Sequence, residues 1–219
     1  MSISLPGTDS RTYIVGSTGS GKTFAGVFQL MLTDFDTNRP AIIFDFKRDK
    51  LLNSLGATEI DVYSRPPTKP GLYIVHPIPE QDDEAVTLMM RRIWENEDTI
   101  VYIDEGYMVG NRNKALNLLL TQGRSKHVQM IILSQRPVWV SRFVRSEADF
   151  FQVFRLNDQT DYDTIQGMIS VDIRERLPKY HSHWYDVAND AGVVFGPVPG
   201  RKQMIENFRR RLHRKTRII

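Results

Sequence analysis

The sequence predicts an α/β fold in which a mainly parallel sheet is covered by helices on both faces. Short apolar runs alternate with segments of helical periodicity over about the first 150 residues. These runs are nearly continuous in apolar residues, as expected of parallel strands that are buried on both faces. The 219 residues are 41% hydrophobic and include no cysteine. The chain can therefore bury a sizeable core, and it has no thiolate, disulfide or cysteine-ligated zinc chemistry.

The strongest patterns predict four strands and three helices. The strands are expected at 12–16, 41–46, 99–105 and 129–134, and the helices at 22–32, 80–96 and 114–124. The helix at 80–96 opens with the acidic run EQDDE, which the positive end of a helix dipole favours. Two weaker strand candidates, IDVYS (60–64) and GLYIVH (71–76), flank the proline-rich RPPTKPG, which predicts a turn.

After about residue 147 the pattern loosens. DFFQVFRL (149–156) is a further strand candidate and TDYDTIQGMI (160–169) a helix candidate. Three residues of the former are interpreted as core: Phe150, Phe151 and Phe154. An apolar stripe at helical spacing lies near the end of the chain, at Met204, Ile205, Phe208 and Leu212. We expect one domain over 1–199, with a motif-bearing core at about 11–155, followed by a basic helix or tail over 200–219.

The segment GSTGSGKT, residues 16–23, matches the phosphate-binding pattern G-x-x-x-x-G-K-[ST]. It follows a predicted strand and opens a predicted helix, the context in which backbone amides of a glycine-rich loop surround phosphate oxygens. Lys22 is expected to reach the β- and γ-phosphates, and Thr23 to bind Mg²⁺. The sequence therefore predicts a P-loop for ATP and Mg²⁺. Its candidate nucleotide-binding residues are Gly16, Ser17, Thr18, Gly19, Ser20, Gly21, Lys22, Thr23 and Phe24.

The strand TIVYIDE (99–105) ends in two carboxylates, as a Walker B motif does. Asp104 is expected to hold Mg²⁺ opposite the P-loop. Glu105 is expected to polarise a water molecule for attack on the γ-phosphate, which is general-base catalysis.

The strand at 129–134 ends in Gln135. P-loop enzymes with a glutamate after the Walker B aspartate place one strand between the P-loop strand and the Walker B strand. Gln135 would then lie beside both the γ-phosphate and the attacking water. A neutral amide suits this position, because it can donate to the phosphate and accept from the water, whereas an acid would repel the phosphate.

Taken together, these segments resemble the FtsK–HerA superfamily of DNA-pumping ATPases. The similar segments are HVQMIILSQRP, the Gly123–Arg124 pair upstream of it, IVYIDE, and IIFDFKRD with Asp45 and Lys47. The resemblance covers about residues 11–137 and implies a RecA-like P-loop NTPase core. Within the superfamily, the short chain is similar to genome-packaging ATPases of double-stranded DNA viruses with an internal membrane.

This resemblance implies an ATP-hydrolysing double-stranded DNA translocase that acts as a homo-hexamer. It also implies capsid-vertex or membrane proteins as partners, and a location at the virion portal vertex or in the cytoplasm of the infected host cell. A motor ring needs a cation that enters the neighbouring subunit's site, and arginine matches phosphate geometry. Arg124 is the candidate. Arg136, Arg142 and Arg145 are alternatives, and Arg124 could instead cap the preceding helix.

Charge is distributed unevenly along the chain. Residues 201–219 hold eight basic residues and one acid, a net charge of +7, whereas residues 1–200 hold 21 basic and 25 acidic residues, a net charge of −4. Such a block attracts polyanions, unless it forms only a solvated helix face. The cations expected to contact DNA phosphates are Arg209, Arg210, Arg211, Arg214, Lys215 and Arg217.

Three other functions stay open from the sequence. A nucleotide or small-molecule kinase would share the P-loop, but it needs no glutamate after the Walker B aspartate. A filamentous-phage-type assembly ATPase usually carries a membrane segment, whereas no apolar run here approaches the roughly 18 residues that a span needs. A nucleotide-dependent regulatory or scaffold protein is the third. His127, His181 and His183 lack ligands at zinc spacing and are interpreted as structural or surface residues.

Overall fold

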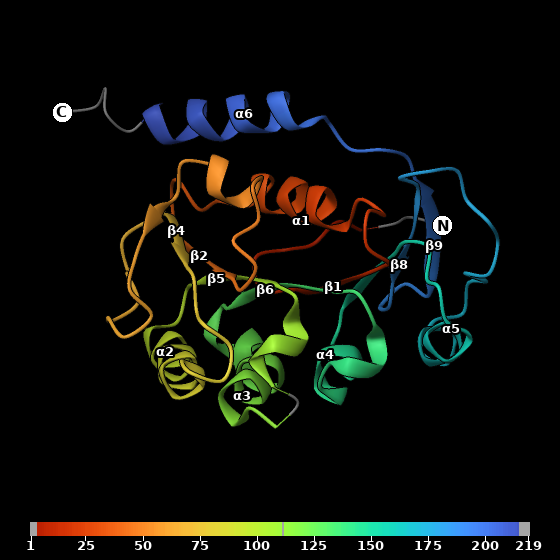
Figure 1. Cartoon of the computed structure of the whole chain (residues 1–219), viewed down its shortest axis with the longest axis horizontal. Helices are drawn as coiled ribbons and strands as arrows, with labels where there is room; N and C mark the ends of the chain where they lie inside the picture. Colours follow the sequence, from red (N-terminus) through yellow and green to blue (C-terminus); the bar gives the residue numbers. More distant parts are fainter. Residues whose placement is uncertain (1–3, 111, 215–219) are drawn as a thin grey trace.

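The computed structural model of the chain describes residues 4–110 and 112–214, and it shows a sheet between two layers of helices (Figure 1). Within the described residues nine strands form one sheet, in the order β3-β4-β2-β5-β6-β1-β7-β8-β9. The strands are β1 (Arg11–Val15), β2 (Pro40–Asp45), β3 (Thr58–Glu59), β4 (Gly71–Val75), β5 (Ile100–Asp104), β6 (Gln129–Ser134), β7 (Phe150–Val153), β8 (Ser182–Asp186) and β9 (Ala191–Phe195). The α-helices are α1 (Lys22–Met31), α2 (Asp83–Asn96), α3 (Lys114–Gln122), α4 (Arg142–Ser146), α5 (Gln159–Gln166) and α6 (Arg201–Arg214), and short 3₁₀ turns connect several of these elements.

The strands that carry the sequence motifs pair in parallel. β6 lies between β1 and β5, with Val15 opposite Ser134 and Ile103 opposite Ile132. This confirms the predicted insertion of one strand between the P-loop strand and the Walker B strand. Only the last two strands of the described chain, β8 and β9, run antiparallel to their neighbours.

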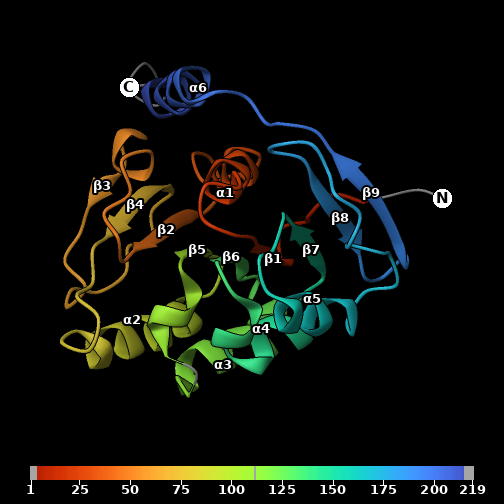
Figure 2. The same ribbon diagram turned by 45° about the vertical axis from the view of Figure 1, so that its right-hand side comes forward.

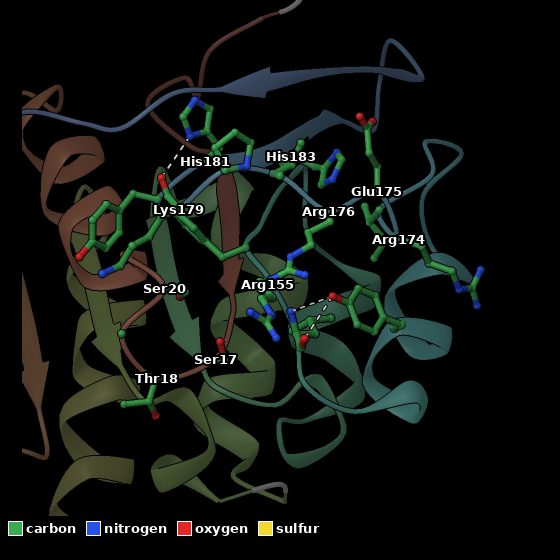
Figure 3. Close-up of a pocket in the computed structure, with 18 residues that line it drawn as sticks. Ser17, Thr18, Ser20, Arg155, Arg174, Glu175, Arg176, Lys179, His181 and His183 are labelled. Atoms are coloured by element: carbon green, nitrogen blue, oxygen red, sulfur yellow. Dashed lines mark hydrogen bonds between the residues drawn. The ribbon is translucent and has the colours of Figure 1, made fainter.

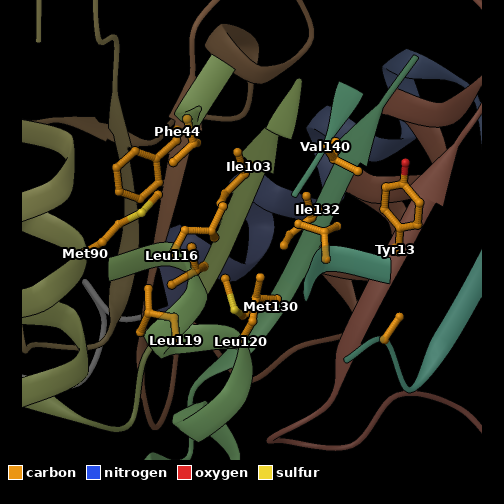
Figure 4. Close-up of a cluster of buried hydrophobic side chains, with 14 of the residues drawn as sticks. Tyr13, Phe44, Met90, Ile103, Leu116, Leu119, Leu120, Met130, Ile132 and Val140 are labelled. Carbon is orange, nitrogen blue, oxygen red and sulfur yellow. The ribbon is translucent and has the colours of Figure 1, made fainter. Parts of the chain in front are cut away.

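Helices cover both faces of the sheet, as predicted: α1 and α6 lie on one face, and α2, α3 and α4 on the other (Figure 1). Successive residues of β1 alternate between these layers, because side chains along a strand point to opposite faces. Tyr13 and Val15 pack on the α2–α4 side, whereas Ile14 packs on the α1 side. Figure 4 shows the first of these clusters, in which side chains of the sheet meet those of α2 and α3.

The C-terminal helix α6 docks on the body of the protein through its apolar stripe. Met204 and Phe208 are fully buried, and the rings of Phe208 and Phe35 stack with their centroids 5.5 Å apart. Arg211 forms an ion pair with Asp36 and donates to the backbone carbonyl oxygens of Met31 and Thr33. The prediction that Arg211 contacts DNA is therefore wrong, because this side chain anchors the helix to the protein.

The division of the chain at residue 200 stays a prediction. Lys215, Arg217 and the side chain of Arg214 lie outside what the structure describes. None of the helices in residues 4–110 and 112–214 is long and apolar enough to cross a membrane.

The strand predicted at 60–64 is wrong. The short strand β3 ends at Glu59, and Ile60 N–H makes one more bond to the carbonyl oxygen of Ile74. The Asp61 side chain then accepts from Tyr63 N–H and its carbonyl accepts from Ser64 N–H, which closes a turn. An aspartate that bonds to the backbone two residues ahead favours such a turn over a strand.

The loosely patterned region after residue 147 contains both confirmed and unpredicted structure. β7 and α5 confirm the strand and helix candidates, and the three phenylalanines interpreted as core are buried: Phe150, Phe151 and Phe154. The β8–β9 hairpin was not predicted. It extends the sheet beside α5 (Figure 2) and is held by the ring of Trp184, which stacks between Phe150 and Phe195.

Candidate nucleotide-binding site

The predicted nucleotide-binding, metal-binding and catalytic residues other than Arg124 lie at one edge of the sheet. Parallel strands end on the same side, so the carboxyl ends of β1, β5 and β6 bring the P-loop, Asp104 and Gln135 together. The end of β2 joins them, with Asp45 in register with Asp104. In an open α/β sheet this edge is where ligands bind.

The P-loop turns tightly between β1 and α1. Gly16 N–H donates to the carbonyl oxygen of Ser134, and Ser17 N–H donates to the carbonyl oxygen of Arg155, at 3.3 and 2.9 Å. A side chain at Gly16 would place its Cβ 2.5 Å from the Cβ of Phe154, so only glycine fits here, where the ends of β1 and β7 lie side by side. These contacts tie the loop to both strands that flank β1.

The N-terminus of α1 is prepared for an anion. Gly21 precedes the helix with φ of 106°, a left-handed conformation that favours glycine. In the described part of the chain no side chain caps this end, and no acid lies in its first turn. The amide groups and the positive end of the helix dipole are thus available to phosphate oxygens, while Thr23 and Phe24 follow in the first turn.

Lys22 is buried at the start of α1, where burial lowers the pKa of its ammonium group and the nearby Glu105 and Asp104 oppose that shift. Its Nζ lies 3.8 Å from the Oε1 of Glu105. A cation with little solvent around it interacts strongly with an incoming phosphate.

Glu105 is held in a strained and well-defined position. Its φ and ψ of 59° and 64° lie in the left-handed region, which non-glycine residues rarely adopt. Only 3% of the residue is exposed. Oε1 accepts from Lys47 Nζ at 2.6 Å and from Gln135 Nε2 at 2.9 Å. The other oxygen, Oε2, is buried and has no hydrogen-bond partner among the described residues. Backbone strain of this kind clusters at active sites.

Asp104 fits the role of a Mg²⁺ ligand. It is buried, and its Oδ1 has no hydrogen-bond partner in the described chain. Burial, with the neighbouring carboxylates of Glu105, Asp49 and Asp45, raises its pKa from 3.8 to about 7. A divalent cation would favour the ionised form.

Together with the hydroxyl of Thr23, Asp104 offers the hard oxygen donors that Mg²⁺ prefers. Mg²⁺ commonly binds one or two protein oxygens and takes its remaining ligands from phosphate and water. No group of three His, Asp or Glu side chains in the described ranges could hold a metal ion by itself.

Gln135 bridges the P-loop and Glu105. Its Oε1 accepts from Thr18 Oγ1 at 3.0 Å, and its Nε2 donates to Glu105 at 2.9 Å. The amide therefore lies between the P-loop and the predicted base Glu105, which is the position predicted from the sequence. Its catalytic role stays a prediction.

Arg124 lies away from these residues. It follows α3 and precedes β6, so it belongs to the edge opposite the P-loop. Its side chain is 59% exposed and pairs with Asp149 at 2.5 Å. The alternative Arg136 is engaged by Asp158 and Asp161 of its own chain. Arg142 and Arg145 lie in α4. Arg124 therefore lies outside its own P-loop site, and its role toward a neighbouring copy stays a prediction.

Two groups of residues beside the P-loop were given no role from the sequence. Lys47 was noted only at the end of a motif strand, yet it makes the shortest contact to Glu105. On the other side, a cavity is lined by the residues that follow β7 and by the segment 173–183, including His181 and His183 (Figure 3). Strand order could have pointed to Arg155, which follows β7 at the P-loop edge. No pattern indicated the segment 173–183.

Comparison with known proteins identifies relatives of the whole chain. The DNA packaging ATPase P9 of Enterobacteria phage PRD1 is 45% identical over 219 residues, which cover 95% of this chain and 96% of P9. No protein-family model matches the chain.

Solved structures share the fold. The genome packaging NTPase B204 of Sulfolobus turreted icosahedral virus 2, in complex with AMPPCP, superposes with a TM-score of 0.69 at 19% identity, covering 88% of this chain and all of that one. EssC (ATPases 2 and 3) of Geobacillus thermodenitrificans superposes with a TM-score of 0.67 at 14% identity, covering 96% of this chain and 45% of that one. The P-loop site and the 45% identity along nearly the whole length show that this chain belongs to the family of the phage DNA packaging ATPase P9.

Proposed function

We propose that this chain hydrolyses ATP, with Mg²⁺, to move double-stranded DNA into a viral capsid. The observation that carries the chemistry is the state of Glu105. One carboxylate oxygen is fixed by Lys47 and Gln135, while the other is buried and without a partner in the described chain. A base that is oriented through one oxygen can use the other to accept a proton from water. The packaging role is supported by the identity to P9 along nearly the whole chain.

In this reaction water attacks the γ-phosphorus, the bond to the β–γ bridging oxygen breaks, and ADP and phosphate form. Glu105 takes the proton of the attacking water, and the Gln135 amide orients that water against the γ-phosphate. Lys22 and the amides at the start of α1 stabilise the negative charge on the phosphate oxygens. Thr23 and Asp104 would hold Mg²⁺, which supplies charge neutralisation at the β- and γ-phosphates when bound.

The test is the rate of phosphate release from ATP with and without double-stranded DNA. The wild-type protein should hydrolyse ATP faster when DNA is present, and Lys22→Ala should abolish hydrolysis under both conditions. Lys50→Ala, an exposed lysine outside the P-loop, is the control and should behave as wild type. A wild-type rate that DNA does not change would contradict the motor. Phosphate transfer to a small acceptor would favour a kinase.

DNA contact is assigned to the exposed cations of α6. Lys202, Arg209 and Arg210 are exposed, while Arg211 anchors the helix to Asp36. Replacing these three exposed residues by alanine should weaken DNA binding. It should also flatten the salt dependence of binding, because each lost phosphate contact removes about one unit of the log–log slope. Arg91→Ala, on the opposite face, is the control for lost charge. An unchanged slope in the triple variant would show that α6 does not contact DNA.

The active form is a homo-hexamer in which Arg124 enters the neighbouring subunit's site. Its placement at the edge opposite its own P-loop, with an exposed side chain, supports this role. Arg124→Ala and Glu105→Gln should each be inactive alone. Mixed together they should recover part of the hydrolysis, because some interfaces then pair an intact Glu105 with an intact Arg124. Mixed rings without any recovery would rule out this role.

A packaging motor acts at the virion portal vertex or in the cytoplasm of the infected cell. Its partners there are capsid-vertex or membrane proteins of the virus. Co-purification of such a protein with assembled particles, lost when the chain is absent, would support this location.

A further inference from the structure

The residue that follows Gln135 is held by a helix from the other side of the P-loop strand. Arg136 Nε donates to Asp161 Oδ2 at 2.8 Å, and a terminal nitrogen of the same guanidinium group lies 3.2 Å from Asp158 Oδ2. Both acids lie at the start of α5, where Asp158 caps the helix. The ring of Trp139 lies 5.2 Å from the guanidinium carbon, which adds a cation–π contact. The Arg136 side chain is therefore bound by three groups of its own chain.

Asp161 is the buried member of this group. Its side chain is only 3% exposed, against 45% for Asp158. Its second oxygen, Oδ1, is buried and has no hydrogen-bond partner among the described residues. A buried carboxylate that loses its cation is strongly destabilised, because its charge is then neither solvated nor compensated. The ion pair between Arg136 and Asp161 is thus a rigid contact rather than a loose surface pair.

The residue before Gln135 is fixed as well. Ser134 is fully buried, and its Oγ donates to the carbonyl oxygen of Arg136 at 3.3 Å. Tyr13 Oη, on β1, lies 2.6 Å from the same Ser134 Oγ. Gln135 therefore stands between two anchored residues. A catalytic group must be held within about 0.5 Å of its productive position, which requires such support from neighbouring residues.

The helix α5 has other contacts that hold it to the protein. Ile165 is fully buried in the core, and the ring of Tyr162 packs against the same cluster. The Tyr162 hydroxyl also bonds to the backbone N–H and carbonyl oxygen of Leu156, at 3.3 and 3.1 Å. These contacts dock α5 without the ion pair. The ion pair therefore adds a constraint on Arg136 rather than an anchor for the helix.

We propose that Asp161 is a positioning residue for ATP hydrolysis. Through Arg136 it fixes the end of β6, and so it holds the Gln135 amide in place beside the attacking water. The inference rests on the proposed function, because it assumes that Gln135 orients this water. Although α5 follows β7 in the chain, Asp161 then acts on the catalytic side of the P-loop, and its loss lowers the rate of hydrolysis rather than the affinity for ATP.

The experiment measures steady-state phosphate release and calorimetric ATP binding, both with Mg²⁺, for the full chain carrying Asp161→Asn. Asparagine keeps the size of the side chain and leaves no unpaired buried charge. The kcat should fall by about three- to tenfold, because a small displacement of a catalytic group lowers the rate, while ATP affinity stays unchanged. Asp163→Asn is the matched control and should keep both quantities. It removes an acid of the same helix whose exposed ion pair, with Arg174 at 2.5 Å, does not reach β6.

A double-mutant cycle separates positioning from a general structural effect. If Asp161 acts through Gln135, Asp161→Asn should slow Gln135→Ala no further, whereas a general structural effect would slow both backgrounds by the same factor. Arg136→Lys is the second variant. It keeps the charge beside Asp161 but lacks the planar fork that binds two carboxylates, so it should show the same lower kcat and the same lack of further effect. It provides the test if denaturant unfolding shows that Asp161→Asn does not fold.

Two failures are distinguishable. If the wild-type protein does not hydrolyse ATP, or if Gln135→Ala hydrolyses it at the wild-type rate, the proposed mechanism itself fails. If Gln135→Ala is slow but Asp161→Asn keeps the wild-type rate, or slows Gln135→Ala by the same factor as it slows wild type, only the positioning role is overturned. A loss of ATP affinity at unchanged kcat would also overturn it.

Discussion

The two sides of the P-loop differ in how they are built. On the β5–β6 side, Glu105 is buried, strained and fixed through one oxygen by neighbours on three other segments. On the β7 side, the cavity is lined by exposed cations, two of them without a partner in the described chain. The groups on the β5–β6 side are oriented before any ligand binds. The β7 side instead offers positive charge that is not paired within the described chain.

This difference matches the demands of the two ends of a nucleotide. Bond breaking requires groups that are already oriented, because reorganising them during the reaction would raise the barrier. Binding the other end requires contact surface but not the same precision of orientation. We therefore expect substitutions on the β5–β6 side to lower the rate of hydrolysis, and those on the β7 side to lower affinity.

Within the β5–β6 side, the largest effect on rate is expected at Glu105. Glu105→Gln keeps the shape of the side chain and loses the base, so hydrolysis should fall by about 10²- to 10⁴-fold while ATP still binds. Steady-state phosphate release and calorimetric ATP binding measure the two quantities. Glu84→Gln, in the first turn of α2, is the matched control and should keep both. Normal turnover by Glu105→Gln would place the base elsewhere.

The raised pKa of Asp104 should make the stability of the nucleotide-free protein depend on pH. Its pKa is raised from 3.8 to about 7, chiefly by burial, so the folded state binds more protons than the unfolded state between these pH values. The free energy of unfolding therefore falls as pH rises through this window, by at most about 4 kcal/mol from this group.

Asp104→Asn removes the ionisable group, and with it the loss of stability caused by a buried negative charge. In denaturant unfolding without nucleotide, the variant should be more stable than wild type at pH 8, and the difference should shrink at pH 5. Equal differences at the two pH values would show that the titration of Asp104 does not set the stability of the site.

Gln135→Ala removes the amide that joins Thr18 to Glu105. ATP should still bind through the P-loop, but hydrolysis should fall by about 10- to 100-fold, at or below the lower end of what one oriented donor contributes. Stimulation by DNA, measured as the ratio of the two rates, should also be lost. An unchanged ratio would make Gln135 only a residue at the end of a strand.

A smaller effect is expected at Lys47. Its ion pair with Glu105 is 2.6 Å long, but its side chain is 37% exposed and Glu105 keeps its contacts to Lys22 and Gln135. Lys47→Met should therefore slow hydrolysis by about tenfold at most, with ATP affinity unchanged, because partly exposed pairs are screened by solvent. Lys47→Arg should recover part of the rate, and Lys50→Met should not alter it. A loss as large as that of Glu105→Gln would assign Lys47 a direct part in the reaction.

The β5–β6 side of the site could be predicted from the sequence, because its residues follow continuous apolar strands. GSTGSGKT, the Asp104–Glu105 pair and Gln135 each stand at the end of such a strand, and strand order then brings them together. The strand at 60–64 failed because Asp61 bonds to the local backbone, which apolar content does not reveal.

The β7 side could not be predicted, since its position depends on tertiary structure. The segment 173–183 has no regular secondary structure except where β8 begins, so neither helical nor strand periodicity of apolar residues indicates it.

The basic tail gives a second example. From the sequence alone Arg211 is predicted to contact DNA, because its partner Asp36 is far away in sequence. Long-range pairing is what a single sequence hides in both cases.

The most direct test of this division is a crystal structure of Glu105→Gln with ATP and Mg²⁺. The account predicts the γ-phosphate beside residues 105 and 135, with the rest of the nucleotide on the β7 side of the P-loop. A nucleotide whose γ-phosphate lies on the β7 side, away from residues 105 and 135, would contradict it.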